Sequence, residues 1–196
     1  MTPDEFRRYG HRLIDLIADY RAGVAARPVR ATSEPDAIKA QLPTEPPSEG
    51  EPFDDVIRDL ETILAPGLTH WQHPRFFGYF PSNAELASVL GDFLSTGLGQ
   101  LGLNWQSSPA LTELEEVCCA WMRSMVGLSP AWSGVIQDTA STCTLLALLC
   151  ARERTTNFSL ARGGLQSEPK PLVVYVSTQS HSSVEKAALL AGFGRM

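Results

Sequence analysis

LVVYVSTQSHSSVE, residues 172–185, is the stretch that decides the fold. Its first five residues form a continuous apolar run rich in β-branched side chains, which is typical of a parallel strand covered on both faces. The polar residues 177–181 follow, and Ser182 with Glu185 three residues later has the spacing of a capping box that opens a helix. The stretch therefore predicts a buried strand, a polar loop and a helix, in that order.

The same order of elements begins earlier in the chain. Residues 134–136 are a short strand candidate, and residues 142–154 have a helical pattern. Strand, helix, strand and helix in succession predict an α/β layer. A stable parallel sheet needs several further strands, so we expect the sheet to be incomplete and the chain to be truncated.

The first half of the chain is predicted to be helical. Thr2, Pro3 and Glu5 start a helix that ends near Gly23, because threonine caps, proline suits the first helical position and glutamate completes the capping box. Further apolar stripes predict helices in residues 53–64, 86–97 and 109–127. Six prolines between positions 28 and 52 predict an extended arm. We therefore expect two regions, an N-terminal helical segment with this arm (residues 1–84) and the start of an α/β domain (residues 85–196).

The composition excludes several classes of protein. The chain of 196 residues is 43% hydrophobic and carries a net charge of −6 without basic clusters, which argues against nucleic-acid binding. No stretch has the roughly 18 to 20 apolar residues of a membrane span, and the charged N-terminus has no apolar signal core, so a cytoplasmic location is expected. The four cysteines lack metal-ligand spacing and are expected to be buried, reduced thiols.

Two polar loops follow the predicted strands, where ligands bind in open α/β sheets. In the first, the hydroxyls of Thr139 and Ser141 stand beside the free backbone N–H groups of a helix start, which together suit a phosphate. Such Ser/Thr clusters are also common as simple helix caps. In the second, His181 lies just before a helix and would face the same crevice, although a lone histidine is often a surface residue.

A third candidate is HWQHPRFFGYFPS, residues 70–82. Its five aromatic side chains could form part of a core or the wall of a pocket for an aromatic ligand. No third ligand of suitable spacing follows His70 and His73, so no metal site is expected.

Four blocks of the sequence resemble, in order and spacing, the group II pyridoxal-phosphate decarboxylases, and above all those that act on aromatic L-amino acids (DOPA, tryptophan, tyrosine). The blocks are HPRFFGYFP (73–81), NWQSSPALTELE (104–115), GVIQDTAS (134–141) and HSSVEKA (181–187). The resemblance covers nearly the whole chain. It implies a fold-type I transferase architecture, in which an N-terminal helical arm precedes the large domain, and pyridoxal 5'-phosphate as the cofactor.

The resemblance also assigns roles to individual residues. It implies that a loop of three residues binds the cofactor phosphate and that His181 stacks on the cofactor ring as a catalytic residue. The phosphate loop consists of Thr139, Ala140 and Ser141, and the implied substrate pocket consists of Trp71, Tyr79, Phe80, Pro81, Ser82, Leu101 and Leu103. Leu101 and Leu103 match residues that a neighbouring subunit contributes, and the N-terminal segment matches one that packs on the partner, so a homodimer is implied.

The chain departs from the family pattern at three of these places. Asp138 stands where animal members often carry glycine, so its carboxylate either points away from the phosphate or weakens its binding by like-charge repulsion. Ser82 replaces a common threonine and Leu103 a common phenylalanine, which enlarges the pocket slightly. The identity of the substrate therefore stays open.

None of the three lysines, Lys39, Lys170 and Lys186, stands where the family's Schiff-base lysine would. We therefore expect the chain by itself to be inactive and to form part of a longer enzyme that converts an aromatic L-amino acid to the amine and CO2. An aldehyde synthase, a decarboxylase of a non-aromatic amino acid, or a non-catalytic dimerisation or binding fragment are the alternatives.

Overall fold

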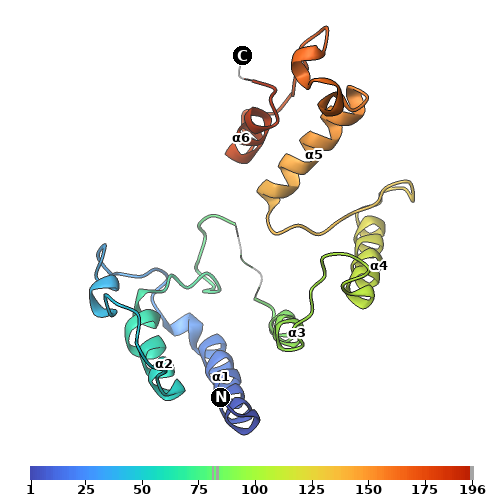
Figure 1. Ribbon diagram of the computed structural model, residues 1–196. Coiled ribbons are helices and arrows are strands. Elements are labelled where there is room, and N and C mark those ends of the chain that lie inside the picture. Colours follow the sequence, from blue (N-terminus) through green and yellow to red (C-terminus); the bar gives the residue numbers. More distant parts are fainter. Residues whose placement is uncertain (81, 83, 195–196) are drawn as a thin grey trace. The chain divides into compact units, whose positions relative to one another are not determined.

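The computed structural model describes residues 1–80, 82 and 84–194. The chain forms two compact units, Met1–Gly97 and Leu98–Met196 (Figure 1). The domain boundary expected between residues 84 and 85 stays a prediction.

The N-terminal unit is built from helices. Its α-helices are α1 (Pro3–Gly23), α2 (Phe53–Asp59) and α3 (Leu86–Gly97), and its short helices are η1 (Val24–Ala26), η2 (Lys39–Gln41), η3 (Leu60–Leu64) and η4 (Ala65–Gly67). α1 and α2 lie side by side (Figure 1), where the Tyr9 ring packs against Phe53 at 4.9 Å between centroids. Asp54 joins the same contact by accepting hydrogen bonds from the Tyr9 hydroxyl at 2.9 Å and from Arg12 at 2.5 Å.

The predicted start of the first helix is confirmed. The Thr2 hydroxyl accepts from the Glu5 amide at 3.2 Å, and the Glu5 carboxylate accepts from the Thr2 amide at 2.6 Å. The helix predicted over residues 53–64 begins at Phe53 but changes at Leu60 to a wider π-helical turn. Gly67 ends this region close to Ile38, and a Cβ at Gly67 would lie 2.9 Å from the Ile38 Cδ1 atom. Glycine therefore allows the proline arm to approach closely.

Two buried histidines join the arm to the aromatic segment. His70 and His73 are each only 3% exposed. The His70 ring shares a 2.8 Å hydrogen bond with the Tyr20 hydroxyl, and its amide donates to the Val29 carbonyl at 2.9 Å. The His73 Nδ1 atom accepts from the Arg75 amide at 3.0 Å, so its Nε2–H donates to the Ala25 carbonyl at 3.2 Å. Their positions are explained by packing within the unit.

We expect the stability of this unit to fall as the pH drops below about 6.5. Burial lowers the pKa of His70 from its ordinary value of 6.5, and the electrostatic effects of Arg27 and His73 act in the same direction. A lowered folded-state pKa means that the unfolded chain binds the proton first. The free energy of unfolding is therefore highest above pH 6.5 and declines below it by up to about 1.4 kcal/mol per pH unit.

Urea unfolding of the chain between about pH 7.5 and 5.5 measures this slope. His70→Gln should flatten it, whereas His11→Gln, at an exposed position of α1, should leave it unchanged. Equal slopes for His70→Gln and the unmodified chain would contradict the assignment to His70.

The C-terminal unit contains α4 (Pro109–Met125), α5 (Ala140–Thr155), η5 (Ser159–Arg162), η6 (Leu165–Ser167) and α6 (Ser182–Leu190). The predicted helices are confirmed, but the predicted strands are not, because the described part of the chain contains no β-strand. Residues 134–136 and 172–176 run without regular secondary structure. A strand is defined by hydrogen bonds to a neighbouring strand, and these segments have no such neighbour among the described residues. The incomplete sheet expected from the sequence is therefore not confirmed.

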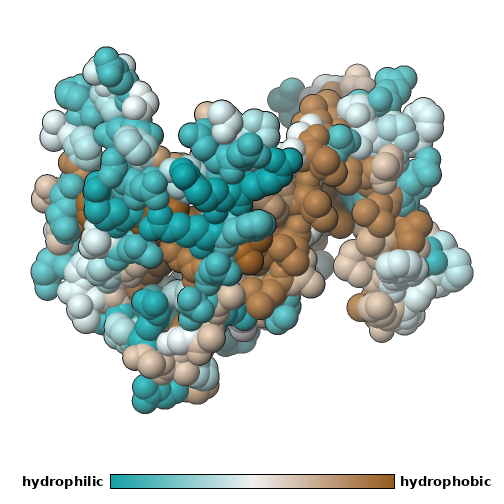
Figure 2. Space-filling model, turned by 90° about the horizontal axis from the view of Figure 1, so that it is seen from below, coloured by the Kyte–Doolittle hydropathy of each residue, from teal (hydrophilic) through white to brown (hydrophobic). Residues whose placement is uncertain are grey.

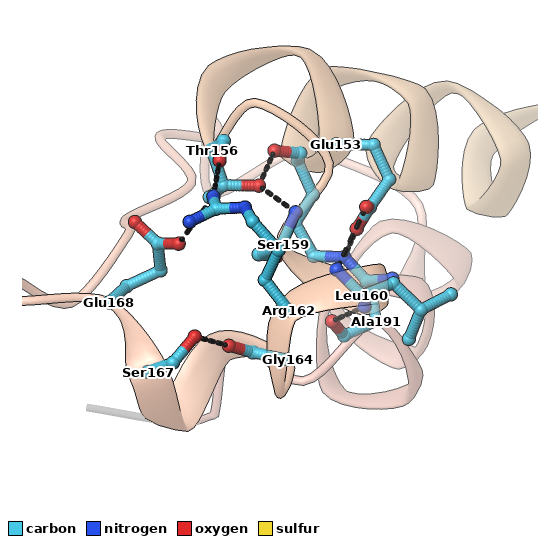
Figure 3. Close-up of polar contacts among 10 residues, drawn as sticks. Glu153, Thr156, Ser159, Leu160, Arg162, Gly164, Ser167, Glu168 and Ala191 are labelled. Atoms are coloured by element: carbon cyan, nitrogen blue, oxygen red, sulfur yellow. Dashed lines mark hydrogen bonds and ion pairs between the residues drawn. The ribbon is translucent and has the colours of Figure 1, made fainter.

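A polar cluster fixes α6 against α5 at their C-terminal ends (Figure 3). Arg152 donates to the Ala191 carbonyl at 2.6 Å and pairs with Glu153 at 2.8 Å. The amide of Leu160 donates to Glu153, which lowers the pKa of this carboxyl together with Arg152 and Arg162. The cluster therefore holds the loop after α5 and the end of α6 in one place.

Large apolar side chains remain exposed on both units. Hydrophobic side chains are visible at the surface in Figure 2. In α3 the exposed side chains are Leu86, Leu90, Phe93 and Leu94, and in α4 they are Leu114, Val117, Trp121, Met122 and Met125. Within the described part of the chain, no helix combines the length and apolar character needed to cross a bilayer.

The cysteines differ partly from expectation. All four are free thiols, and Cys119 is buried, but Cys143 and Cys150 on α5 are exposed. The prediction of four buried thiols was therefore wrong for these two. Both lie on helical surfaces that nothing in the described chain covers.

Candidate functional site

The first polar loop forms the N-terminus of α5. Thr139 is the N-cap, and its hydroxyl oxygen accepts from the Thr142 amide at 3.2 Å. The amides of Ala140 and Ser141 are the first two of the helix and have no intrahelical partner. Together with the Ser141 hydroxyl they are donors at the positive end of the helix dipole, which suits an anionic group such as a phosphate. Capping and phosphate binding are therefore compatible at this loop.

The second polar loop forms the N-terminus of α6. The capping box predicted for Ser182 is wrong, because His181 is the N-cap and Ser182 is the first helical residue. The His181 Nδ1 atom lies 3.2 Å from the Ser183 amide and 2.9 Å from the Ser183 hydroxyl oxygen. An imidazole thus replaces the usual hydroxyl or carboxylate cap.

The two loops meet at one cavity of about 280 Å³. Ser141 and His181 both border it, although they are 40 positions apart in the sequence. α5 and α6 therefore run side by side in the same direction, since their N-terminal ends share the cavity and their C-terminal ends share the Arg152–Ala191 contact. Ser141 and His181 thus border the same cavity, while the roles expected for them at the edge of a sheet stay predictions.

The aromatic segment lies in the N-terminal unit. The Trp71 ring stacks on Tyr79 at 5.5 Å and packs against Phe76 at 4.9 Å. Tyr79 is 92% exposed and has a φ of +53°, which is uncommon for a bulky residue. Gln72 donates to the Ser82 carbonyl at 2.5 Å and to its hydroxyl at 3.1 Å.

The other predicted pocket residues are placed as follows. Phe80 is exposed in the N-terminal unit, and Pro81 lies outside the described residues. Leu101 and Leu103 are 65% and 75% exposed in the C-terminal unit. A single pocket formed by all of these residues stays a prediction.

Comparison with known protein families identifies the family of the chain. The model of the pyridoxal-dependent decarboxylase conserved domain matches residues 35–196. The chain belongs to the pyridoxal-dependent decarboxylase family. The resemblance inferred from the four sequence blocks is thereby confirmed.

The chain is similar to the following three proteins. The aromatic-L-amino-acid decarboxylase of Rattus norvegicus is 42% identical over 98% of this chain and 42% of its own length. The tryptophan decarboxylase of Catharanthus roseus, solved in complex with L-tryptophan, matches 99% of this chain and 42% of its own with 35% identity and a TM-score of 0.87. The 4-hydroxyphenylacetaldehyde synthase of Rhodiola rosea matches 98% of this chain and 41% of its own with 35% identity and a TM-score of 0.87. The chain thus spans about two fifths of the length of these relatives.

The structure places at the cavity further residues that the sequence did not assign to the candidate site. Ser183 and Lys186 border the cavity beside His181. Their spacing was a usable signal, because positions three apart lie on the same face of a helix. The sequence indicates only that Lys186 does not stand where the family's Schiff-base lysine would, and its place at the cavity comes from the fold. In the described chain no group of three or more metal-ligating side chains forms a metal site.

Proposed function

We propose that the chain is part of a longer enzyme that uses pyridoxal 5'-phosphate to convert an aromatic L-amino acid to the amine and CO2. The observation that carries this proposal is the shared cavity of Ser141 and His181. Membership of the family supplies the cofactor class. The Schiff-base lysine is expected outside these 196 residues.

The residues at the start of α5 fit the cofactor phosphate. The amides of Ala140 and Ser141 and the Ser141 hydroxyl would donate to its oxygens, while Thr139 holds the helix start in place. Asp138 is exposed and does not border the cavity. Ala140 does not border the cavity either, so both alternatives for the Asp138 carboxylate stay open.

His181 would stack on the cofactor ring and limit how the substrate is oriented. When bound, the cofactor supplies a sink for the electron pair released as the carbon–carboxylate bond breaks. The protein contributes orientation, and His181 is anchored for this purpose by its contacts to Ser183. The exposed ring is accessible from the cavity.

The aromatic segment would hold the substrate ring. Trp71, Tyr79 and Phe80 offer flat apolar surfaces, and the uncommon backbone of Tyr79 is the kind of local strain that is concentrated at ligand sites. Pro81 and Ser82 would continue this wall. Leu101 and Leu103 would come from the neighbouring subunit of a homodimer, which is supported by the exposed apolar side chains of α3 and α4.

The complete fold would be the large domain of a fold-type I enzyme preceded by a helical arm. The parallel course of α5 and α6 supports this, since successive strand–helix units on one face of a parallel sheet place their helices in the same direction. Residues 134–136 and 172–176 would become strands when neighbouring strands supply their hydrogen bonds.

Product analysis tests the proposed reaction. The longer enzyme, loaded with cofactor and given tryptophan, tyrosine or DOPA, should release CO2 and the matching amine in equal amounts. The likeness to the Rhodiola rosea synthase makes aldehyde formation the second candidate, and an aldehyde with little amine would replace the first proposal by the second.

The isolated chain is the matched control. It should form neither product, and borohydride reduction in the presence of the cofactor should trap no stoichiometric adduct at Lys186. Such an adduct, or turnover of only non-aromatic amino acids by the longer enzyme, would contradict the proposal.

A further inference from the structure

The N-cap of α6 restricts where His181 can carry its proton. The Ser183 backbone N–H lies 3.2 Å from the His181 Nδ1 atom, and it can only donate. Nδ1 must therefore accept this hydrogen bond and carry no proton. In a neutral imidazole the single proton then resides on Nε2.

The Ser183 side chain provides a second contact to the same atom. Its hydroxyl oxygen is 2.9 Å from Nδ1, and with Nδ1 already acting as an acceptor the hydroxyl is the donor. Both contacts come from one residue that is partly buried beside the cavity, whereas the histidine ring is exposed. The ring is thus held along its Nδ1 edge, and the Nε2–H group remains available as a donor.

We propose that Ser183 is a positioning residue that holds His181 in the Nε2–H tautomer and sets the orientation of its ring at the cavity. The relevance of this arrangement to catalysis rests on the proposed function. The tautomer itself is a property of this chain and needs neither cofactor nor substrate. Because His181 is the N-cap of α6 and also borders the cavity, the hydrogen bonds that start the helix set the tautomer of its ring.

Nitrogen NMR of the chain, labelled with ¹⁵N in its histidines, tests the proposal. Spectra are recorded at about pH 9, well above the ordinary pKa of histidine, so that the rings are neutral. The His181 signals are assigned by their loss in His181→Gln. The unmodified chain should show a protonated Nε2 and a bare Nδ1 for His181.

Three variants distinguish the effect of the Ser183 hydroxyl on the His181 tautomer from general effects on folding. Ser183→Ala keeps the backbone donor but loses the hydroxyl, so the ratio of the Nε2–H to the Nδ1–H tautomer should fall about fivefold, the effect of one ordinary hydrogen bond. Ser183→Thr should restore the ratio. Ser180→Ala is the matched control, because the Ser180 hydroxyl makes no hydrogen bond within the described chain and does not border the cavity.

Two results would overturn the proposal. One is a proton on Nδ1 of His181 in the unmodified chain, and the other is an identical tautomer ratio in Ser183→Ala and Ser180→Ala. Neither result depends on turnover. Failure of the longer enzyme to form amine would leave the tautomer measurement intact, so the two proposals fail separately.

Discussion

Replacing His181 by alanine should lower the rate of amine formation by the longer enzyme at least about 100-fold. A displacement of the reacting groups by roughly 1 Å has an effect of this size. The ring borders the cavity and is the N-cap of α6, so the substitution removes the cap and, under the proposed function, the surface that stacks on the cofactor. The loss should appear mainly in kcat. Steady-state assays with each aromatic amino acid measure it.

His181→Phe separates the two contributions. Phenylalanine keeps a flat ring for stacking but has no Nδ1 acceptor, so we expect activity between that of the unmodified enzyme and that of His181→Ala. His11→Ala is the matched control, since His11 is exposed on α1, far along the chain from the cavity. Turnover of every aromatic amino acid at the normal rate by His181→Ala would contradict the assigned role.

Replacing Ile57 by alanine should reduce the free energy of unfolding of the N-terminal unit by about 2 to 5 kcal/mol. Ile57 is only 1% exposed and is the largest hydrophobic side chain fully buried within the described residues. The substitution removes packed methylene groups and leaves a cavity that a small unit can close only in part. α2 holds Phe53 and Asp54 against Tyr9 of α1. Weaker packing of α2 would therefore also weaken the packing of α1.

Val56→Ala is the control for this prediction. Val56 is the preceding residue of the same helix and is 48% exposed. Its truncation should cost about 0.5 kcal/mol or less, as is usual for surface positions. Urea unfolding followed by circular dichroism compares the two variants, and equal midpoints would show that Ile57 is not a core residue.

The helices were predictable because their signals are local. Pro109 at a first helical position marked the start of α4, and the capping box of Thr2 and Glu5 marked the start of α1. The wider turn that begins at Leu60 and the exposure of Cys143 were not predictable in this way, because they depend on which surfaces the helix meets. The prediction of strands at residues 134–136 and 172–176 was not confirmed, for a related reason. Strand formation depends on neighbours that the sequence pattern does not contain.

In the candidate site, too, the features that depend on local sequence were predictable and those that depend on the fold were not. The helix start at Thr139 was predictable because a hydroxyl cluster before a helix is a local pattern, and phosphate binding at this loop stays a prediction. The role of His181 as the cap in place of Ser182 was not, since both residues are compatible with the spacing and the backbone decides between them. The aromatic segment was identified by composition, yet the contact of Trp71 with Tyr79 required the fold of the loop.

By itself, the sequence determined the family, most of the helices and the chemical character of the two polar loops, because these depend on residue type and on spacing along one segment. The tertiary structure alone decided that Ser141 and His181 border one cavity, that Arg152 ties the end of α5 to Ala191, and that Tyr20 bonds to His70. Contacts between residues about 40 to 50 positions apart depend on how helices pack, and packing is a property of the folded chain as a whole.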